Sequence, residues 1–176
     1  LMLYNEVANN GKMMKPYLVN SIKEMGIEIK SFKPQVLVEK ICSDATLGKL
    51  KASMLAVMES EHGTGHLLKS NEYSFAGKTG TAVTAMDNRG YNKGAKIYQS
   101  SFIGYFPEVN PKYTIAVVIQ NGSESRLAYG GVGSAAVVKD VAERIYAAEF
   151  SNPVNNFQGR FAGNQYRIYV LKTNLN

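Results

Sequence analysis

The apolar positions of three stretches recur every three or four residues, which is typical of amphipathic helices. The first stretch covers residues 1–10. The second follows a capping residue, Ser43 or Asp44, and ends at Gly63, and the third begins after Gly131. Their apolar positions are Leu3, Val7 and Ala8, then Leu47, Leu50, Met54, Val57 and Met58, then Val137, Val138, Val141, Ile145 and Tyr146. The pattern therefore predicts three helices.

Between the second and third helices the pattern changes to runs that are typical of strands. Runs at about Tyr73–Val83, at Tyr98–Phe106 and at Tyr113–Asn121 predict three strands, and the turn at residues 107–111 makes the last two a hairpin. Residues 115–119 are apolar at every position, so the last strand is expected in the interior of a sheet, covered on both faces.

Residues 18 to 40 hold shorter runs, which predict a small and irregular β excursion. The runs are Tyr17–Val19, Ile27–Ile29 and Gln35–Val38, and they are interrupted by Gly26 and Pro34. Strands that follow one another, with helices on either side, favour an α+β fold with an antiparallel sheet. The expected organisation is one domain at residues 1–150 and a tail or linker at 151–176, whose segment 166–171 has high β-propensity.

The composition excludes several classes of protein. Apolar residues make up 45% and charged residues 19% of the 176, so the chain is globular rather than disordered or fibrous. No uncharged apolar run approaches the roughly 18 residues of a membrane helix. The one cysteine, Cys42, forms no internal disulfide or zinc cluster and is expected to be a small buried side chain. The net charge of +6 has no clustered basic helix face, which argues against nucleic acid.

The segment Ala76–Thr81, Ala-Gly-Lys-Thr-Gly-Thr, carries the candidate chemistry. A phosphate-binding loop would need a glycine at position 72, where Glu72 stands, and its lysine would not lie inside a strand. Lys-Thr-Gly on a strand is instead one signature of the serine acyltransferases that react with β-lactams. Such a strand pairs with an extended peptide, its ammonium attracts the substrate carboxylate, and its glycine leaves room for the acyl group.

Four further motifs accompany that strand in the sequence. The chain carries them at residues 4–16 (Tyr-Asn-Glu-Val-Ala-Asn-Asn-Gly-Lys-Met-Met-Lys-Pro), 62–65 (His-Gly-Thr-Gly), 101–113 (Ser-Phe-Ile-Gly-Tyr-Phe-Pro, then Asn-Pro-Lys-Tyr) and 129–131 (Tyr-Gly-Gly). In this order and spacing the five motifs resemble class B penicillin-binding proteins, the transpeptidases of cell-wall synthesis, and the septal cell-division type among them. The resemblance implies the C-terminal part of a serine transpeptidase and β-lactamase-like fold, with three of its sheet strands present.

The resemblance also implies roles for four residues. Lys78 is expected to bind the carboxylate of a D-alanyl-D-alanine stem peptide and to help proton transfer, and Gly80 to leave room for the acyl group. Thr81 is expected to complete the oxyanion hole and hold the carboxylate, whereas Thr79 faces inward. Because side chains alternate along a strand, Lys78 and Thr81 reach the same cleft only if the strand twists or bulges near Gly80.

Two family signatures are missing. No serine here has lysine three residues later or asparagine two residues later, so the nucleophile and the proton-relay serine are expected outside this chain. The implied function is part of a peptidoglycan D,D-transpeptidase that forms a serine acyl-enzyme and binds β-lactams, from a parent anchored in the bacterial membrane with its catalytic domain in the periplasm. The alternatives are part of a non-catalytic β-lactam sensor, or a degenerate homologue that never acylates.

Several secondary expectations complete the sequence reading. No metal and no cofactor is expected, because His62 and His66 lack a carboxylate at ligand spacing and are expected to be loop residues. The loop from Arg89 to Lys96 is expected to be a solvated face that could border the cleft. Without the two N-terminal strands that the family's fold implies beside residues 113–121, the chain is expected to self-associate through open sheet edges, unless the segment at 166–171 replaces them.

Overall fold

The structure is a computed structural model that describes residues 1–84, 91, 97–121, 133–150 and 166–172. Its main sheet is antiparallel and has the strand order β5-β6-β7-β8. The strands are β5 (Ala76–Thr84), β6 (Ile97–Phe106), β7 (Tyr113–Asn121) and β8 (Tyr166–Lys172). The predicted hairpin is confirmed as β6 and β7, and the expected α+β class with an antiparallel sheet is confirmed as well.

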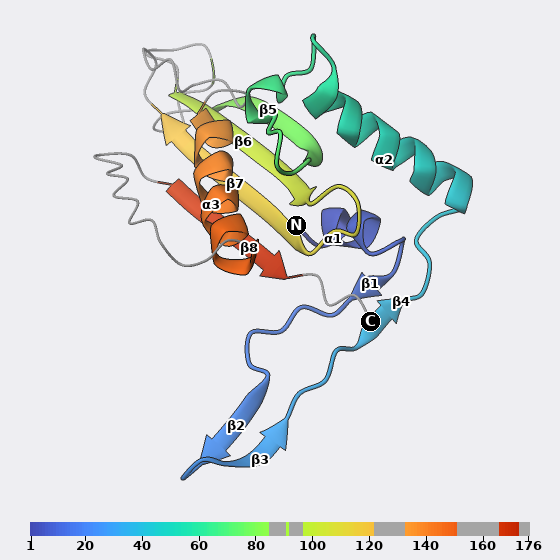
Figure 1. Ribbon diagram of the computed structural model, residues 1–176, viewed down its shortest axis with the longest axis vertical. Coiled ribbons are helices and arrows are strands. Elements are labelled where there is room, and N and C mark those ends of the chain that lie inside the picture. The colour runs from blue at the N-terminus through green and yellow to red at the C-terminus, as the bar shows by residue number, and fades with distance from the viewer. Residues whose placement is uncertain (85–90, 92–96, 122–132, 151–165, 173–176) are drawn as a thin grey trace.

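The sheet is covered on both faces by helices that the sequence predicted (Figure 1). On one face Phe102 and Val117 pack against α3 (Gly133–Phe150). On the other face Tyr105 packs against α1 (Met2–Ala8), while α2 (Asp44–Glu59) runs beside β5. The two clusters use alternate residues of β6, as the strand period requires.

The three expected strands are β5, β6 and β7, and β8 adds a fourth strand to the sheet by pairing with β7 over residues 113–119 and 166–172. Residues Ile115, Ala116 and Val117 of β7 are 0%, 5% and 0% exposed, so this strand is covered on both faces and also needs backbone partners on both edges. β6 pairs with one edge of β7, and the segment at 166–172 pairs with the other. The domain boundary at residue 150 stays a prediction.

The helix boundaries follow local chemistry. The Ser43 hydroxyl caps α2 by accepting a hydrogen bond from the Thr46 amide at 3.2 Å, as predicted. The helix ends at Glu59, earlier than the predicted Gly63. At the end of α1 the chain reverses through Asn10 and Gly11, which have φ of 54° and 86°.

The β excursion consists of two short ladders in line. β1 (Met13–Met14) pairs with β4 (Val36–Val38), and β2 (Ser21–Glu24) pairs with β3 (Ile27–Ser31). The two ladders project from the body of the molecule as a long arm (Figure 1). The prediction of a strand at residues 17–19 is wrong, because these residues lie between the two ladders.

That gap follows from two prolines on opposite sides of the arm. Pro16 and Pro34 each lack an amide hydrogen, so neither donates to a ladder. The first ladder ends with a hydrogen bond from the Lys15 amide to the Gln35 carbonyl at 2.8 Å. Pairing resumes with the Phe32 amide and the Asn20 carbonyl, also at 2.8 Å.

Candidate functional site

The candidate site lies on β5, the end strand of the sheet. β5 pairs with β6 in an unbroken register, from Ala76 opposite Tyr105 to Thr84 opposite Ile97. Its first residue, Ala76, is buried beneath α1 and α2. The strand becomes exposed after this buried end, beginning at Lys78 of its Lys-Thr-Gly-Thr segment.

Lys78 is exposed two residues after the buried Ala76 and on the same face of the strand. Its Nζ donates a hydrogen bond to the carbonyl oxygen of Thr79 at 2.8 Å. The ammonium therefore contacts the backbone of its own strand. It lies on the sheet face that α1 and α2 cover at Ala76, at a position where this face is exposed. An exposed ammonium beside an edge strand suits an anionic group on an extended ligand.

Thr79 points to the opposite side and is 8% exposed. Its hydroxyl lies 2.5 Å from the hydroxyl of Thr64, so one of them donates a hydrogen bond to the other. This bond ties β5 to the His-Gly-Thr-Gly loop that precedes it by fifteen positions. Thr79 was expected to face inward, but its partner Thr64 was not predicted, although the nearby Gly-Thr-Gly motif was the available signal.

The loop that presents Thr64 is held against the end of α2. The Gly65 amide donates to the Val57 carbonyl at 3.0 Å. A Cβ at Gly63 would lie 2.3 Å from that same carbonyl oxygen, and a Cβ at Gly65 would lie 2.5 Å from the sulfur of Met58. Gly63 is therefore required by the backbone beside it, whereas a side chain at Gly65 would displace the Met58 side chain. This close packing holds the loop that carries Thr64.

Gly80 lies on the face of Lys78 and opposite Ser101 of β6. A Cβ at Gly80 would lie 2.5 Å from the Ser101 hydroxyl oxygen, so glycine keeps this part of the strand open. Of the two alternatives expected near Gly80, a twist or a bulge, the bulge is absent, because the register with β6 does not shift there. Lys78 and Thr81 therefore stand on opposite faces of a regular edge strand, with Thr81 exposed.

The neighbouring residues singled out from the sequence lie as follows. His62 and His66 are exposed. Within the described segments, no group of three His, Cys, Asp or Glu side chains is placed to hold a metal ion. Cys42 is half-buried against the core cluster beneath α1. The loop from Arg89 to Lys96, apart from the exposed Tyr91, and the Tyr-Gly-Gly motif lie outside the described residues.

Three tyrosines near the core have raised pKa values. Burial is the main cause for each, and it raises the pKa of Tyr73, Tyr105 and Tyr113 to about 12. The Tyr113 hydroxyl also bonds the Glu149 carboxylate, which adds to its shift and joins β7 to α3.

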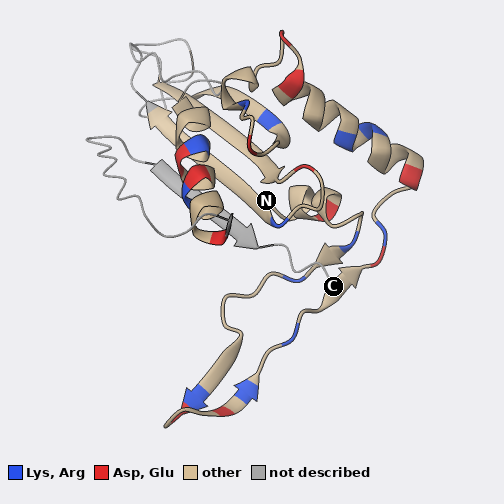
Figure 2. Ribbon diagram, viewed as in Figure 1, with Lys and Arg blue, Asp and Glu red and all other residues tan. Residues whose placement is uncertain are grey.

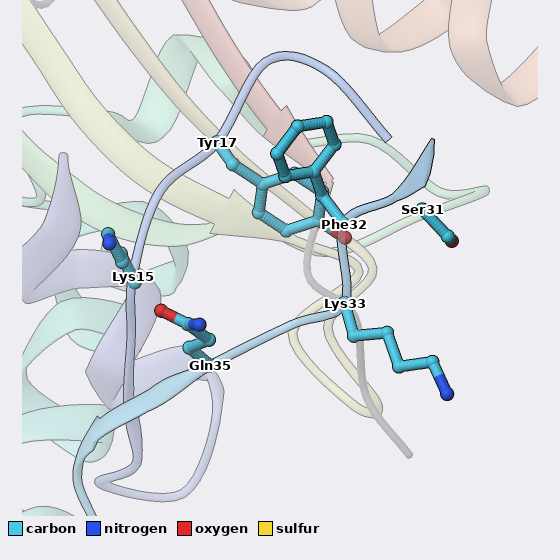
Figure 3. A pocket seen from close by; sticks show the side chains of 6 residues that line it. All are labelled: Lys15, Tyr17, Ser31, Phe32, Lys33 and Gln35. Atoms are coloured by element: carbon cyan, nitrogen blue, oxygen red, sulfur yellow. The ribbon is translucent and has the colours of Figure 1, made fainter. Parts of the chain in front are cut away.

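A hollow that the sequence did not predict lies in the arm. It occupies about 210 Å³ between the two ladders and is lined by Lys15, Tyr17, Ser31, Phe32, Lys33 and Gln35 (Figure 3). Each wall comes from one side of the arm, so only the pairing of distant residues brings these side chains together.

The sequence matches the family model described as the penicillin binding protein transpeptidase domain over residues 1–143. The chain belongs to the penicillin-binding protein transpeptidase family. Its relatives include penicillin-binding protein H of Bacillus subtilis, 33% identical over 64% of the chain and 16% of the relative. Another is a probable peptidoglycan D,D-transpeptidase PbpC of Pseudomonas aeruginosa, 30% identical over 78% of the chain and 24% of the relative.

Solved structures of this family share the fold of the chain. The D,D-transpeptidase domain of a peptidoglycan glycosyltransferase from Eggerthella lenta superposes with a TM-score of 0.62 and 27% identity, covering 85% of this chain and 31% of that one. Penicillin-binding protein A of Mycobacterium tuberculosis, as an imipenem acyl-enzyme, gives a TM-score of 0.61 and 25% identity over 81% and 29% of the two chains. The chain thus spans less than a third of the relatives that it matches here. No described helix has the length and hydropathy needed to cross a membrane.

Proposed function

We propose that this chain supplies the substrate-binding strand of a peptidoglycan D,D-transpeptidase that cross-links stem peptides through a serine acyl-enzyme and binds β-lactams. The observation that carries the proposal is Lys78, exposed on an unbroken edge strand whose next residue, Thr79, is anchored to Thr64. Family membership and the relatives named D,D-transpeptidase support it. So does the relative seen as an imipenem acyl-enzyme.

In this proposal the edge strand receives an extended peptide. The stem peptide ending in D-alanyl-D-alanine pairs with β5 as an added strand, and the Lys78 ammonium attracts its terminal carboxylate and aids proton transfer. Gly80 leaves space for the acyl group, since any larger residue would meet Ser101. Thr81 contributes its amide to the oxyanion hole and its hydroxyl to the carboxylate, while Thr79 holds the strand in place.

Because β5 shows no bulge, Thr81 reaches the cleft through its backbone and through the twist of the strand. Successive backbone amides of an edge strand point alternately toward and away from the neighbouring strand, whichever face the side chains take. An oxyanion contact through the Thr81 amide therefore does not need the Thr81 side chain on the face of Lys78. The proposal for the hydroxyl depends on the right-handed twist that strands carry.

The attacking serine must come from residues other than these 176. None of the serines here fits the Ser-x-x-Lys or Ser-x-Asn signature, and without a nucleophile there is no covalent path. We propose a parent protein of the septal cell-division type, anchored in the cytoplasmic membrane, with its catalytic domain in the periplasm. The motifs at residues 4–16 and 101–113 support that assignment.

A labelling experiment tests the division of roles. The purified 176-residue chain is incubated with a fluorescent penicillin and separated by denaturing electrophoresis, beside the longer parent protein. We expect a labelled parent and no labelled band for the 176 residues alone. A stable covalent band on the short chain would show that a nucleophile lies within it and would overturn the proposal.

Lys78→Ala in the parent protein tests the role of the strand. An exposed lysine changes stability by about 0.5 kcal/mol or less, whereas a lost charged contact to the reacting substrate costs several kcal/mol of transition-state stabilisation. We expect penicillin acylation to slow by about 100-fold or more at an unchanged melting temperature. Lys49→Ala on α2 is the matched control, and an unchanged acylation rate in Lys78→Ala with a lower melting temperature would make Lys78 structural.

A further inference from the structure

The arm formed by residues 15–38 concentrates the exposed apolar surface of the molecule. Ten of the sixteen exposed large hydrophobic side chains among the described residues lie within residues 17–38. Leu18 and Met25 are 101% and 98% exposed, and Ile27 is 71% exposed. Isolated exposed hydrophobics are ordinary, but a cluster on one projecting element marks an interaction surface.

The backbone of the arm is also incompletely paired. In the part of the chain that the structure describes, β2 and β3 pair only with each other, so the outer edge of each strand has no ladder partner. A two-stranded hairpin without further cover is marginally stable in water. A third strand from a partner would satisfy one edge and cover apolar residues of the same arm.

The charge of the arm selects the kind of partner. Lys15 and Lys33 line the hollow in the stem, the part of the arm between the two ladders, and no acidic side chain lines it. Figure 2 shows only blue between the two ladders of the arm, and both blue and red in the ladder at its tip. Two lysine side chains and the rings of Tyr17 and Phe32 line the same hollow, and this combination suits a carboxylate carried on an apolar segment.

The charged residues at the tip of the arm oppose the binding of the arm to a lipid surface. Glu24 and Glu28 flank the exposed Met25, and Glu28 lies directly opposite Lys23 across the hairpin. Carboxylates beside the apolar tip oppose insertion into a membrane, particularly an anionic one. They do not oppose a protein strand that lies along the stem.

We propose that residues 15–38 form a docking arm for a partner protein that presents an extended segment of alternating acidic and apolar residues. An acidic side chain of the partner enters the hollow that Lys15 and Lys33 line, and apolar side chains farther along the same segment cover Leu18 and Leu37. The arm lies on a different part of the chain from β5, so this binding does not require acylation and does not depend on the proposed enzymatic function.

A peptide titration tests the docking arm. The probe is a capped peptide, Val-Glu-Val-Asp-Leu-Glu-Val, added to the ¹⁵N-labelled 176-residue chain, with a second peptide in which lysine replaces every acid. We expect shift changes confined to residues 15–38, a dissociation constant that rises with salt, and no response to the lysine peptide. Vesicles of equal phosphatidylglycerol and phosphatidylcholine are the membrane arm of the test.

Matched variants separate charge from apolar contact. We expect Lys33→Gln to weaken binding by about threefold to tenfold and Leu18→Ser to weaken it similarly, while Lys49→Gln and Leu67→Ser outside the arm leave it unchanged. Circular dichroism checks that each variant is folded. Absent or scattered shift changes, equal effects of Lys49→Gln and Lys33→Gln, or binding to vesicles but not to the acidic peptide would each overturn the proposal.

Discussion

At the scale of single residues, the hydrogen bond between Thr64 and Thr79 holds β5, the strand that carries the candidate site, in place. One hydroxyl belongs to a loop that two glycines press against α2, and the other to an 8% exposed side chain of β5. Since neither residue carries charge or reacts, their role is to position β5 and with it Lys78.

Thr64→Val tests this contact. Valine keeps the shape of threonine but leaves the buried hydroxyl of Thr79 without this partner, which costs about 1–2 kcal/mol of unfolding free energy. We expect that loss in urea denaturation, and faster amide exchange in residues 76–81. Thr64→Ser keeps the hydroxyl and serves as the control. Unchanged exchange in Thr64→Val would mean that β5 is held by its pairing with β6 alone.

Glu6 is a second residue with a measurable consequence. Its side chain in α1 is 1% exposed, and among the described residues its Oε1 atom has no hydrogen-bond partner. Burial raises the pKa of this carboxyl above its ordinary value of 4.5. The native state therefore retains a proton over a pH range in which the unfolded state has released it.

The sign of the pH dependence follows from that difference. The contribution of Glu6 to the unfolding free energy is fully present below the pKa that Glu6 has in the unfolded state. It is lost as the pH rises through the raised pKa of the folded state. We expect Glu6→Gln to reduce the fall in unfolding free energy between pH 4.5 and pH 8, measured by urea denaturation at several pH values. Exposed Glu61→Gln is the control. An equal pH slope in wild type and Glu6→Gln would show that Glu6 is not the group responsible.

At the scale of elements, two glycines allow the effect of helix propensity on stability to be measured apart from the effect of a left-handed backbone conformation. Gly48 lies inside α2, where an added Cβ would meet nothing within 4 Å. Gly11 follows α1 and has φ of +86°, which L residues rarely adopt. The same substitution should therefore act in opposite directions at the two sites.

Gly48→Ala should raise the unfolding free energy by about 0.5–1 kcal/mol, because alanine is the better helix former and has less freedom to lose. Gly11→Ala should lower it by about 1 kcal/mol or more, because the turn requires a left-handed backbone. Chemical denaturation of the two variants measures both changes. The same sign in both would mean that the turn after α1 does not constrain Gly11.

The elements that local chemistry defines were predictable, and those that depend on a distant partner were not. The Ser43 cap and the β6–β7 hairpin follow from residues a few positions apart. The absence of a strand at residues 17–19 depends on Pro16 and Pro34, which follow and precede the paired residues Lys15 and Gln35 on opposite sides of the arm. Hydrophobic runs predict strands, but the partner decides how far each strand extends.

The same limit applies to the candidate site. Lys78 and Gly80 were identifiable from a short motif, and the alternation of the strand placed Thr79 inward. The Thr64 contact and the stem hollow join residues fifteen or more positions apart, so no local pattern contains them. The bulge at Gly80 was inferred from a functional requirement rather than from residues, and the unbroken register with β6 removes it.

At the scale of the whole molecule, β8 decides how the sheet ends. The sequence analysis expected self-association through the β7 edge unless the segment at 166–171 replaced the missing partner. That segment pairs with β7 along residues 113–119. Self-association stays a prediction, and with β8 in place it requires either exchange of β8 between copies or pairing at another edge.

Deleting residues 151–176 tests what β8 protects. The deletion exposes the edge of β7, a strand buried on both faces, and such an edge pairs readily with another chain. We expect the shortened chain to show a higher mass than the full chain in size-exclusion chromatography with light scattering, at the same concentration. A dilution series serves as the control for reversible association. Equal masses, together with fast amide exchange in residues 113–121, would contradict the prediction.

The order of strands in the sheet has a consequence for biosynthesis. The synthesis of β7 is complete at Asn121, but its second partner strand, β8, is complete only when Lys172 has been added. A ribosome adding roughly 5–20 residues per second needs about 3–10 s to make the intervening 51 residues. The β6–β7 hairpin forms within about 10 μs of leaving the exit tunnel. When the 176-residue chain is made in the cytoplasm without export, each nascent chain therefore displays an apolar, unpaired strand edge for seconds. The yield of soluble protein then depends on how quickly translation proceeds beyond residue 121 and on chaperones that shield the edge meanwhile.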